Sequence, residues 1–115
     1  MANTFKLVTK AGVTSADVIY TVAGSTTTVV LGIMLGNTTT SQITATVTIE
    51  SDTSNRSGAN NEANQNVELV TNAPIPSGAS LELLAGNKVI IETTYVLKLT
   101  ATGATDKALS IMEIT

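Results

Sequence analysis

The stretch that decides the fold class is Ile43-Thr44-Ala45-Thr46-Val47-Thr48-Ile49-Glu50, in which apolar and polar residues alternate one by one. Alternation at this period places the two kinds of side chain on opposite faces of a β-strand. Threonine suits the solvent-facing side, because its branched side chain is favoured on a pleated surface and restricted in a helix. We therefore expect a half-buried strand whose core-facing residues are Ile43, Ala45, Val47 and Ile49.

The same alternation recurs along the chain in short segments. Turn-forming residues separate them, as at Ala11-Gly12, Pro76-Ser77-Gly78 and Thr102-Gly103. No window carries an apolar stripe of helical period and length. The segments that we expect to be strands are 4–9, 17–22, 27–37, 42–50, 66–71, 80–84, 88–92, 95–101 and 107–114. Eight or nine short strands predict an all-β protein, an antiparallel β-sandwich of the immunoglobulin-like or jelly-roll-like kind, formed by residues 1–115 as one domain.

Three segments have special features. Residues 54–66 contain no large apolar residue and are rich in asparagine, which predicts a long surface loop. The run from Val29 to Leu35 is apolar on both sides, as expected of a core strand whose second face is covered by a loop or a partner. In the segment 66–71, we expect Val67 and Leu69 to face inward.

The composition is that of a chain with a nearly uncharged surface. Charged residues make up 13% of the sequence, and its aromatic residues are Phe5, Tyr20 and Tyr95. A protein that stays alone in solution normally carries more charge. A hydroxyl-rich, weakly charged surface is easier to desolvate, so this composition favours a subunit that is largely covered by other subunits.

Several classes of function lack the residues that they need. The sequence contains no His and no Cys, and its nine acidic residues are scattered, which argues against an enzyme and against a metal or cofactor site. A net charge of −3 with dispersed basic residues argues against binding of nucleic acid. The apolar runs are too short to cross a membrane, and the residues after Met1 do not have the pattern of a secretory signal. We expect no small-molecule substrate.

Three stretches, Val18–Val30, Asn72–Leu81 and Leu109–Ile114, resemble in their order a family of small virion structural proteins of tailed bacteriophages, especially marine and cyanobacterial phages. Gly32-Ile33 and Asn37-Thr38-Thr39 add to the resemblance. It implies a capsid decoration or cement protein, made in the host cytoplasm, that binds the major capsid protein or other virion subunits in many copies. Alternatives are a small tail, neck or fibre component, or a receptor- or carbohydrate-binding module. The scarcity of aromatic side chains argues against a sugar-stacking surface.

Assembly contacts are expected at strand edges, turns and termini. The segments 27–37 and 107–114 carry few of the lysines, prolines and inward charges that blunt an edge strand. The terminal segments 2–10 and 111–115 are strand-like, and we expect them to be free to add to a neighbouring sheet. This predicts a homo-oligomer, with contacts at Thr4, Phe5, Lys6, Asn55, Arg56, Asn60, Asn61, Ile111 and Ile114.

Overall fold

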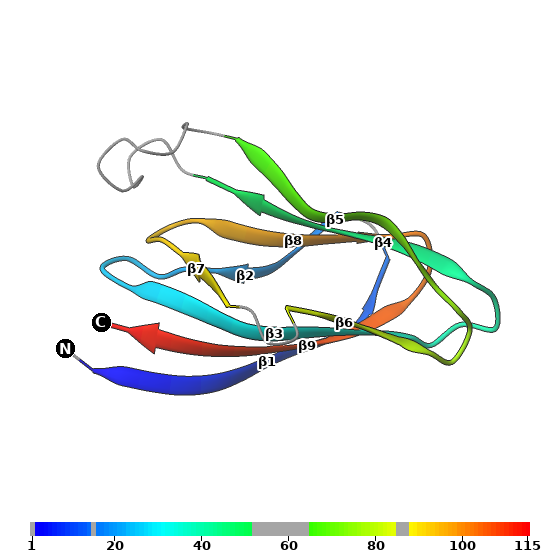
Figure 1. The fold of residues 1–115 in the computed structure, drawn as a ribbon, viewed down its shortest axis with the longest axis horizontal. Coiled ribbons are helices and arrows are strands. Elements are labelled where there is room, and N and C mark those ends of the chain that lie inside the picture. The colour runs from blue at the N-terminus through cyan, green and yellow to red at the C-terminus, as the bar shows by residue number, and fades with distance from the viewer. Residues whose placement is uncertain (1, 15, 52–64, 85–87) are drawn as a thin grey trace.

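A computed structural model describes residues 2–14, 16–51, 65–84 and 88–115. These residues form strands and no helix, and the strands run along the long axis of the molecule with both termini at one end (Figure 1). The strands are β1 (Asn3–Val13), β2 (Asp17–Thr21), β3 (Thr27–Asn37), β4 (Ile43–Glu50), β5 (Asn66–Ile75), β6 (Ser80–Leu83), β7 (Val89–Ile91), β8 (Val96–Ala101) and β9 (Thr105–Ile114). Each of the nine segments predicted from the alternation overlaps one of them, and β1, β5 and β9 extend beyond the predicted bounds.

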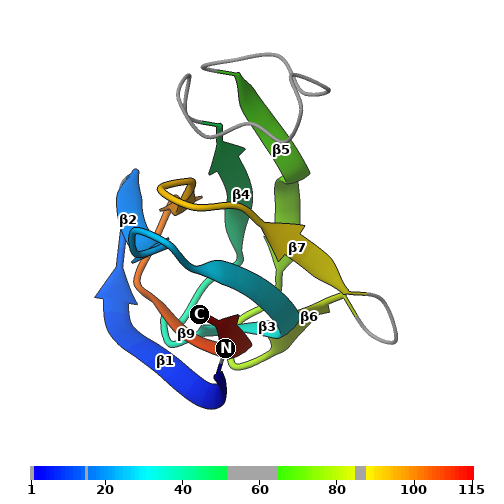
Figure 2. The same ribbon diagram turned by 90° about the vertical axis from the view of Figure 1, so that its left-hand side faces the viewer.

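Two antiparallel sheets form the layers of a sandwich, which Figure 2 shows end-on. Sheet A has the order β1-β9-β3-β6, with β7 also paired to β3, and sheet B has the order β2-β8-β4-β5. Because β6 and β7 pair with successive parts of β3, they act as one interrupted edge strand. With β6 and β7 counted as one strand, each sheet has four strands, and their order is that of a jelly roll. The predicted β-sandwich is confirmed.

An aliphatic core fills the space between the sheets. Its most deeply buried residues lie on the inner strands of the two layers, where Leu35, Leu99 and Leu109 have no exposed surface. On β4, Ile43, Ala45 and Val47 are buried as predicted, whereas Ile49 is only partly buried. The alternation therefore gave the correct facing of this strand, and the burial decreases where β4 approaches its end.

Val67 and Leu69 were predicted to face inward, and Val67 lies on the predicted side of β5 without being buried. In the register Val67 lies opposite Ile49, whose side chain packs against the core, so both side chains project to the same face of sheet B. Val67 is nevertheless 54% exposed, because it lies at the end of sheet B where burial is incomplete, whereas Leu69 is partly buried.

The prediction that β3 and β9 are edge strands is also wrong. β9 lies between β1 and β3, and β3 lies between β9 and the interrupted strand formed by β6 and β7. Both strands carry few edge-blocking residues because both are interior. The C-terminal segment 111–115 is therefore paired within the chain and is not free to add to another sheet. Of the predicted loop 54–66, residues 54–64 lie outside the described residues.

Candidate assembly edge

The N-terminal strand β1 is an edge strand with an unusually long regular side. It pairs only with β9, and its register is unbroken from Asn3 to Lys10 before a shift near Gly12. Along this stretch only Val8 is partly buried, and the other residues are exposed. Figures 1 and 2 show the strand at the margin of sheet A. The side of β1 that faces away from β9 is therefore open to another strand.

Backbone hydrogen bonds at the two termini establish which groups of β1 face this open side. The Ala2 N–H donates to the Thr115 oxygen at 3.1 Å, and the Thr115 N–H donates to the Ala2 oxygen at 3.0 Å. In an antiparallel pair, such doubly bonded positions alternate with non-bonded ones. The continuous register therefore directs the N–H and C=O groups of four alternate residues away from β9: Asn3, Phe5, Leu7 and Thr9.

The other strands at the margins of the two sheets are short or irregular. In sheet A, β6 and β7 span four and three residues. In sheet B, β2 spans five residues and is interrupted by a bulge, and β5 contains two register shifts. Asn72 of β5 has a φ of 48°, and Pro74 has no N–H to donate. These are features with which proteins prevent unwanted strand pairing, so β1 differs from the other edges in its long unbroken register from Asn3 to Lys10.

A hydrogen-bonded network holds β1 against the body of the sandwich. Lys6 of β1 forms an ion pair with Glu113 of β9 at 2.7 Å, and the Tyr20 hydroxyl of β2 donates to the other oxygen of Glu113 at 2.5 Å. Because the only Tyr20 proton is used there, the buried Thr28 hydroxyl donates to the Tyr20 oxygen at 2.8 Å. The network joins both sheets through four side chains, so it orders the part of β1 that carries Phe5 and Leu7.

The electrostatics of this network follow from its contacts. The hydrogen bonds from Lys6 and then from Tyr20 lower the pKa of Glu113 below its ordinary value. Desolvation, together with the adjacent Glu113 carboxylate, raises the pKa of Tyr20 to about 12. At neutral pH the network therefore consists of an ammonium, a carboxylate and a neutral phenol, which is the arrangement that the observed hydrogen bonds require.

A second charged cluster lies where β1 leaves sheet A. Lys10 forms an ion pair with Asp17 at 2.6 Å, and the hydrogen bond from Lys10 is the main reason why the pKa of Asp17 lies below its ordinary value. Lys107, opposite Lys10 in the register, is 3% exposed. Its ammonium donates to the Ile19 carbonyl at 3.0 Å. Ile19 is the residue that the β2 bulge leaves out of the register with β8, so Lys107 satisfies a carbonyl that the bulge displaces.

The predicted contact residues fall into three groups in the structure. Thr4, Phe5 and Lys6 lie on the open strand β1, and Ile114 lies beside Asn3 on β9. Ile111 is fully buried in the core, so its assignment as a contact is wrong. Ile111 and Ile114 are three residues apart on β9, so alternation places their side chains on opposite faces of the strand, and only Ile114 faces away from the core. The remaining four residues lie outside the described part of the chain: Asn55, Arg56, Asn60 and Asn61.

The structure also brings in residues that the sequence did not single out. Leu7 and Thr9 complete the set of open backbone groups on β1, and Tyr20 and Glu113 hold the strand in place. The alternation of Phe5 and Leu7 with Lys6 and Val8 was a usable signal for the facing of β1. No signal in the sequence reveals that Tyr20 reaches Glu113, since the two residues are far apart along the chain.

In the part of the chain that the structure describes, no three or more acidic, histidine or cysteine side chains lie together in a way that could hold a metal ion. The same residues contain no helix of the length and apolar character that a membrane crossing requires.

No protein-family model matches the sequence, and no curated protein is similar to it. A chain in the solved structure of Bacillus endospore appendages, described as a novel family of disulfide-linked pili, is similar to this chain. The TM-score is 0.47 and the identity 14%, over 99% of this chain and 87% of that chain. At this level of identity the likeness concerns the fold alone. The sequence of 115 residues contains no cysteine, so these residues cannot form the disulfides that the name of those pili describes.

The structural likeness corrects the function expected from the phage resemblance. The similar chain belongs to a bacterial endospore appendage and not to a phage capsid, so the expectation of a capsid decoration protein, with its alternatives in the tail, neck or fibre, is contradicted. The stretches behind that expectation include much of β2, β3 and β9, whose alternating residues are shared by sandwich strands in general. Such a pattern specifies an architecture and not a biological setting.

Proposed function

We propose that this protein is a non-enzymatic structural subunit that assembles by adding the open edge of β1 in one copy to a sheet edge of another copy. The observation that carries the proposal is the continuous row of outward backbone groups at Asn3, Phe5, Leu7 and Thr9. An edge strand of this length with an unbroken register is a template for strand addition. Such addition supplies backbone hydrogen bonds without requiring aromatic or charged side chains.

The side chains of β1 are compatible with being covered by a second copy. Phe5 and Leu7 are 72% and 65% exposed, so their burial would add a hydrophobic contribution. The two lysines of the strand are the residues that could resist pairing. Each is already neutralised within the chain, Lys6 by Glu113 and Lys10 by Asp17. The low charge of the whole sequence, at 13%, reduces repulsion between identical copies.

The test is a proline substitution that blocks the open edge and leaves the fold intact. The N–H of Thr9 points away from β9, so Thr9→Pro removes an outward donor without removing a bond between β1 and β9. Its matched control is Thr9→Ala, which removes the same exposed side chain and keeps the N–H. Sedimentation velocity and light scattering over a range of concentrations measure the assembled mass of each variant.

The proposal predicts a concentration-dependent assembly for the wild type and for Thr9→Ala, and a smaller assembled mass for Thr9→Pro at unchanged melting temperature. Pairing of β1 with β1 closes a dimer, whereas pairing of β1 with a different edge continues to a ring or filament. The mass therefore also distinguishes the two arrangements. Assembly of Thr9→Pro as strong as that of Thr9→Ala, or a wild type that stays monomeric at high concentration, contradicts the proposal.

A further inference from the structure

We infer that the outer face of sheet A, the face directed away from the core, is a second contact surface that packs against the same face of another copy of this chain. Four of the six large hydrophobic residues that are most exposed in the described structure lie on this face: Phe5, Leu7, Met34 and Ile90. This surface is formed by side chains, so it is separate from the backbone edge of β1 used above.

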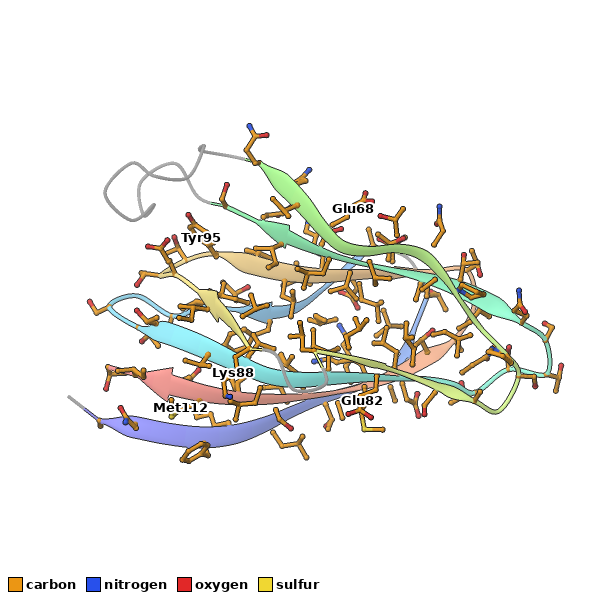
Figure 3. The ribbon with its side chains drawn as sticks, viewed as in Figure 1. Glu68, Glu82, Lys88, Tyr95 and Met112 are labelled. Carbon is orange, nitrogen blue, oxygen red and sulfur yellow. The ribbon has the colours of Figure 1, made fainter. Side chains whose placement is uncertain are left out.

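The centre of the face is an apolar ridge that crosses the whole sheet. Phe5 of β1 lies opposite Met112 of β9, which lies opposite Val29 of β3, which lies opposite Ile90 of β7. Phe5 and Ile90, at the two ends of the ridge, are 72% and 65% exposed. Met112 is labelled in Figure 3. Because neighbouring strands are about 4.8 Å apart, the four side chains are in lateral contact range and form one continuous row.

Beside the ridge, small residues lie on the two central strands between the exposed side chains of Leu7 and Met34. Leu7 lies opposite Ser110, which lies opposite Gly32, and the next outward residue of β9, Ala108, lies opposite Met34. A side chain placed on Gly32 would meet no other atom within 4 Å, so the space above it is open. A ridge next to a shallow trough is complementary to itself, because a copy turned by two-fold rotation can seat its ridge in the trough.

The distribution of charge supports an identical partner. Among the outward positions of β1, β9 and β3, the only charged residue that the structure describes is Asp106, at the far end of the face. Its carboxylate accepts the Gly12 N–H at 3.0 Å. Glu82 and Lys88 lie at the margin by β6 and β7 (Figure 3). An apolar centre with charges only at its rim is typical of protein interfaces, and its centre carries no charge by which a charged partner would be recognised.

The size of the face is sufficient for a specific contact between two copies. Four strand positions at a spacing of about 4.8 Å and eight residues at a rise of about 3.3 Å each cover roughly 500 Å². Two copies that pack face to face therefore bury roughly 1,000 Å² in total, which reaches the lower limit for a biological interface. The face is thus large enough for a second copy.

The test uses a charge at the ridge end that is far from β1. Ile90→Lys places an ammonium at one end of the apolar ridge, within the proposed contact, and because Ile90 is 65% exposed the change does not disturb the core. The matched control is Val67→Lys, the same kind of change at a residue of sheet B that is 54% exposed. Sedimentation equilibrium measures self-association, and thermal unfolding confirms that each variant is folded.

The inference predicts that Ile90→Lys weakens self-association at least about tenfold, whereas Val67→Lys leaves it unchanged. Unchanged association of Ile90→Lys overturns the inference, even if Thr9→Pro shows that the β1 edge is used. Weakening by Ile90→Lys together with normal assembly of Thr9→Pro supports the face and contradicts the proposed edge. A wild-type protein that is monomeric at high concentration overturns both the face contact and the edge contact. If that monomer binds phosphatidylcholine vesicles, the face is a lipid-binding surface and not a contact between copies.

Discussion

Lys107 gives the protein a pH dependence of stability that can be worked out from the structure. It is the only charged side chain among the buried residues that the structure describes. Burial lowers its pKa from the ordinary 10.5 to about 8, the nearby charge of Lys10 adds to this effect, and Asp17 opposes it. The perturbation to test is Lys107→Met, which keeps the length of the side chain and removes the titratable group.

The sign and size of the effect follow from the two pKa values. Below pH 8 the lysine is protonated in both the folded and the unfolded chain, and the folded state bears the cost of the buried charge. Between pH 8 and 10.5 the folded state releases the proton first, so the unfolded state binds more protons and stability rises with pH. The expected increase in the free energy of unfolding is about 2 kcal/mol between pH 7 and about pH 9.5.

Urea unfolding followed by circular dichroism, at constant ionic strength between pH 7 and about pH 9.5, measures this increase. The wild type should gain stability over the range, and Lys107→Met should not. Since Lys107→Met also leaves the Ile19 carbonyl without its donor, the slope with pH is the diagnostic quantity and not the stability at one pH. Lys88→Met, at an exposed lysine, should keep the wild-type slope. Equal slopes in the wild type and Lys107→Met refute the reasoning.

The remaining predictions concern the core and the network behind β1. Val47→Asp should unfold the protein, because an unpaired carboxylate in the fully buried position costs several kcal/mol. Thr46→Asp, on the opposite face, should have a melting temperature within a few degrees of the wild type. Equal melting temperatures of the two variants would mean that the facing of β4 is misassigned. Tyr20→Phe should cost about 1–3 kcal/mol in chemical denaturation, because the buried Thr28 hydroxyl and Glu113 each lose a partner. It should also raise the Glu113 pKa, which carboxylate chemical shifts would report, and an unchanged pKa would show that Tyr20 does not influence Glu113.

Much of the fold could be predicted from the sequence because burial imposes a period of two on a strand. Ile43, Ala45 and Val47 show this directly, since each has a hydroxyl-bearing neighbour that faces the other way. Strand order could not be predicted in the same way. The interior position of β9 depends on how distant segments pair, and a low number of edge-blocking residues is compatible with an interior strand as well as with an open edge.

The candidate site was predictable only in part, for a related reason. Phe5 is an apolar residue at a position where the alternation of the strand places the side chain on the outer face, and this local signal is sufficient to mark it as a contact. The open backbone groups of β1 and the Lys6–Glu113–Tyr20 network depend on pairings across almost the whole length of the chain. Bulges are a further obstacle, because the displaced Ile19 carbonyl that holds Lys107 arises from a single extra residue in β2. Alternation alone does not indicate where such a residue is inserted.

Residue-resolved hydrogen exchange of β1 tests the central claim, assembly through its open edge, most directly. The N–H groups of Phe5, Leu7 and Thr9 point away from β9, whereas those of Lys6 and Val8 are bonded to it. At high protein concentration, edge pairing should slow exchange at Phe5, Leu7 and Thr9 at least about tenfold relative to dilute protein, and leave Lys6 and Val8 unchanged. Fast exchange at those three amides in a protein shown by its mass to be assembled would contradict the claim.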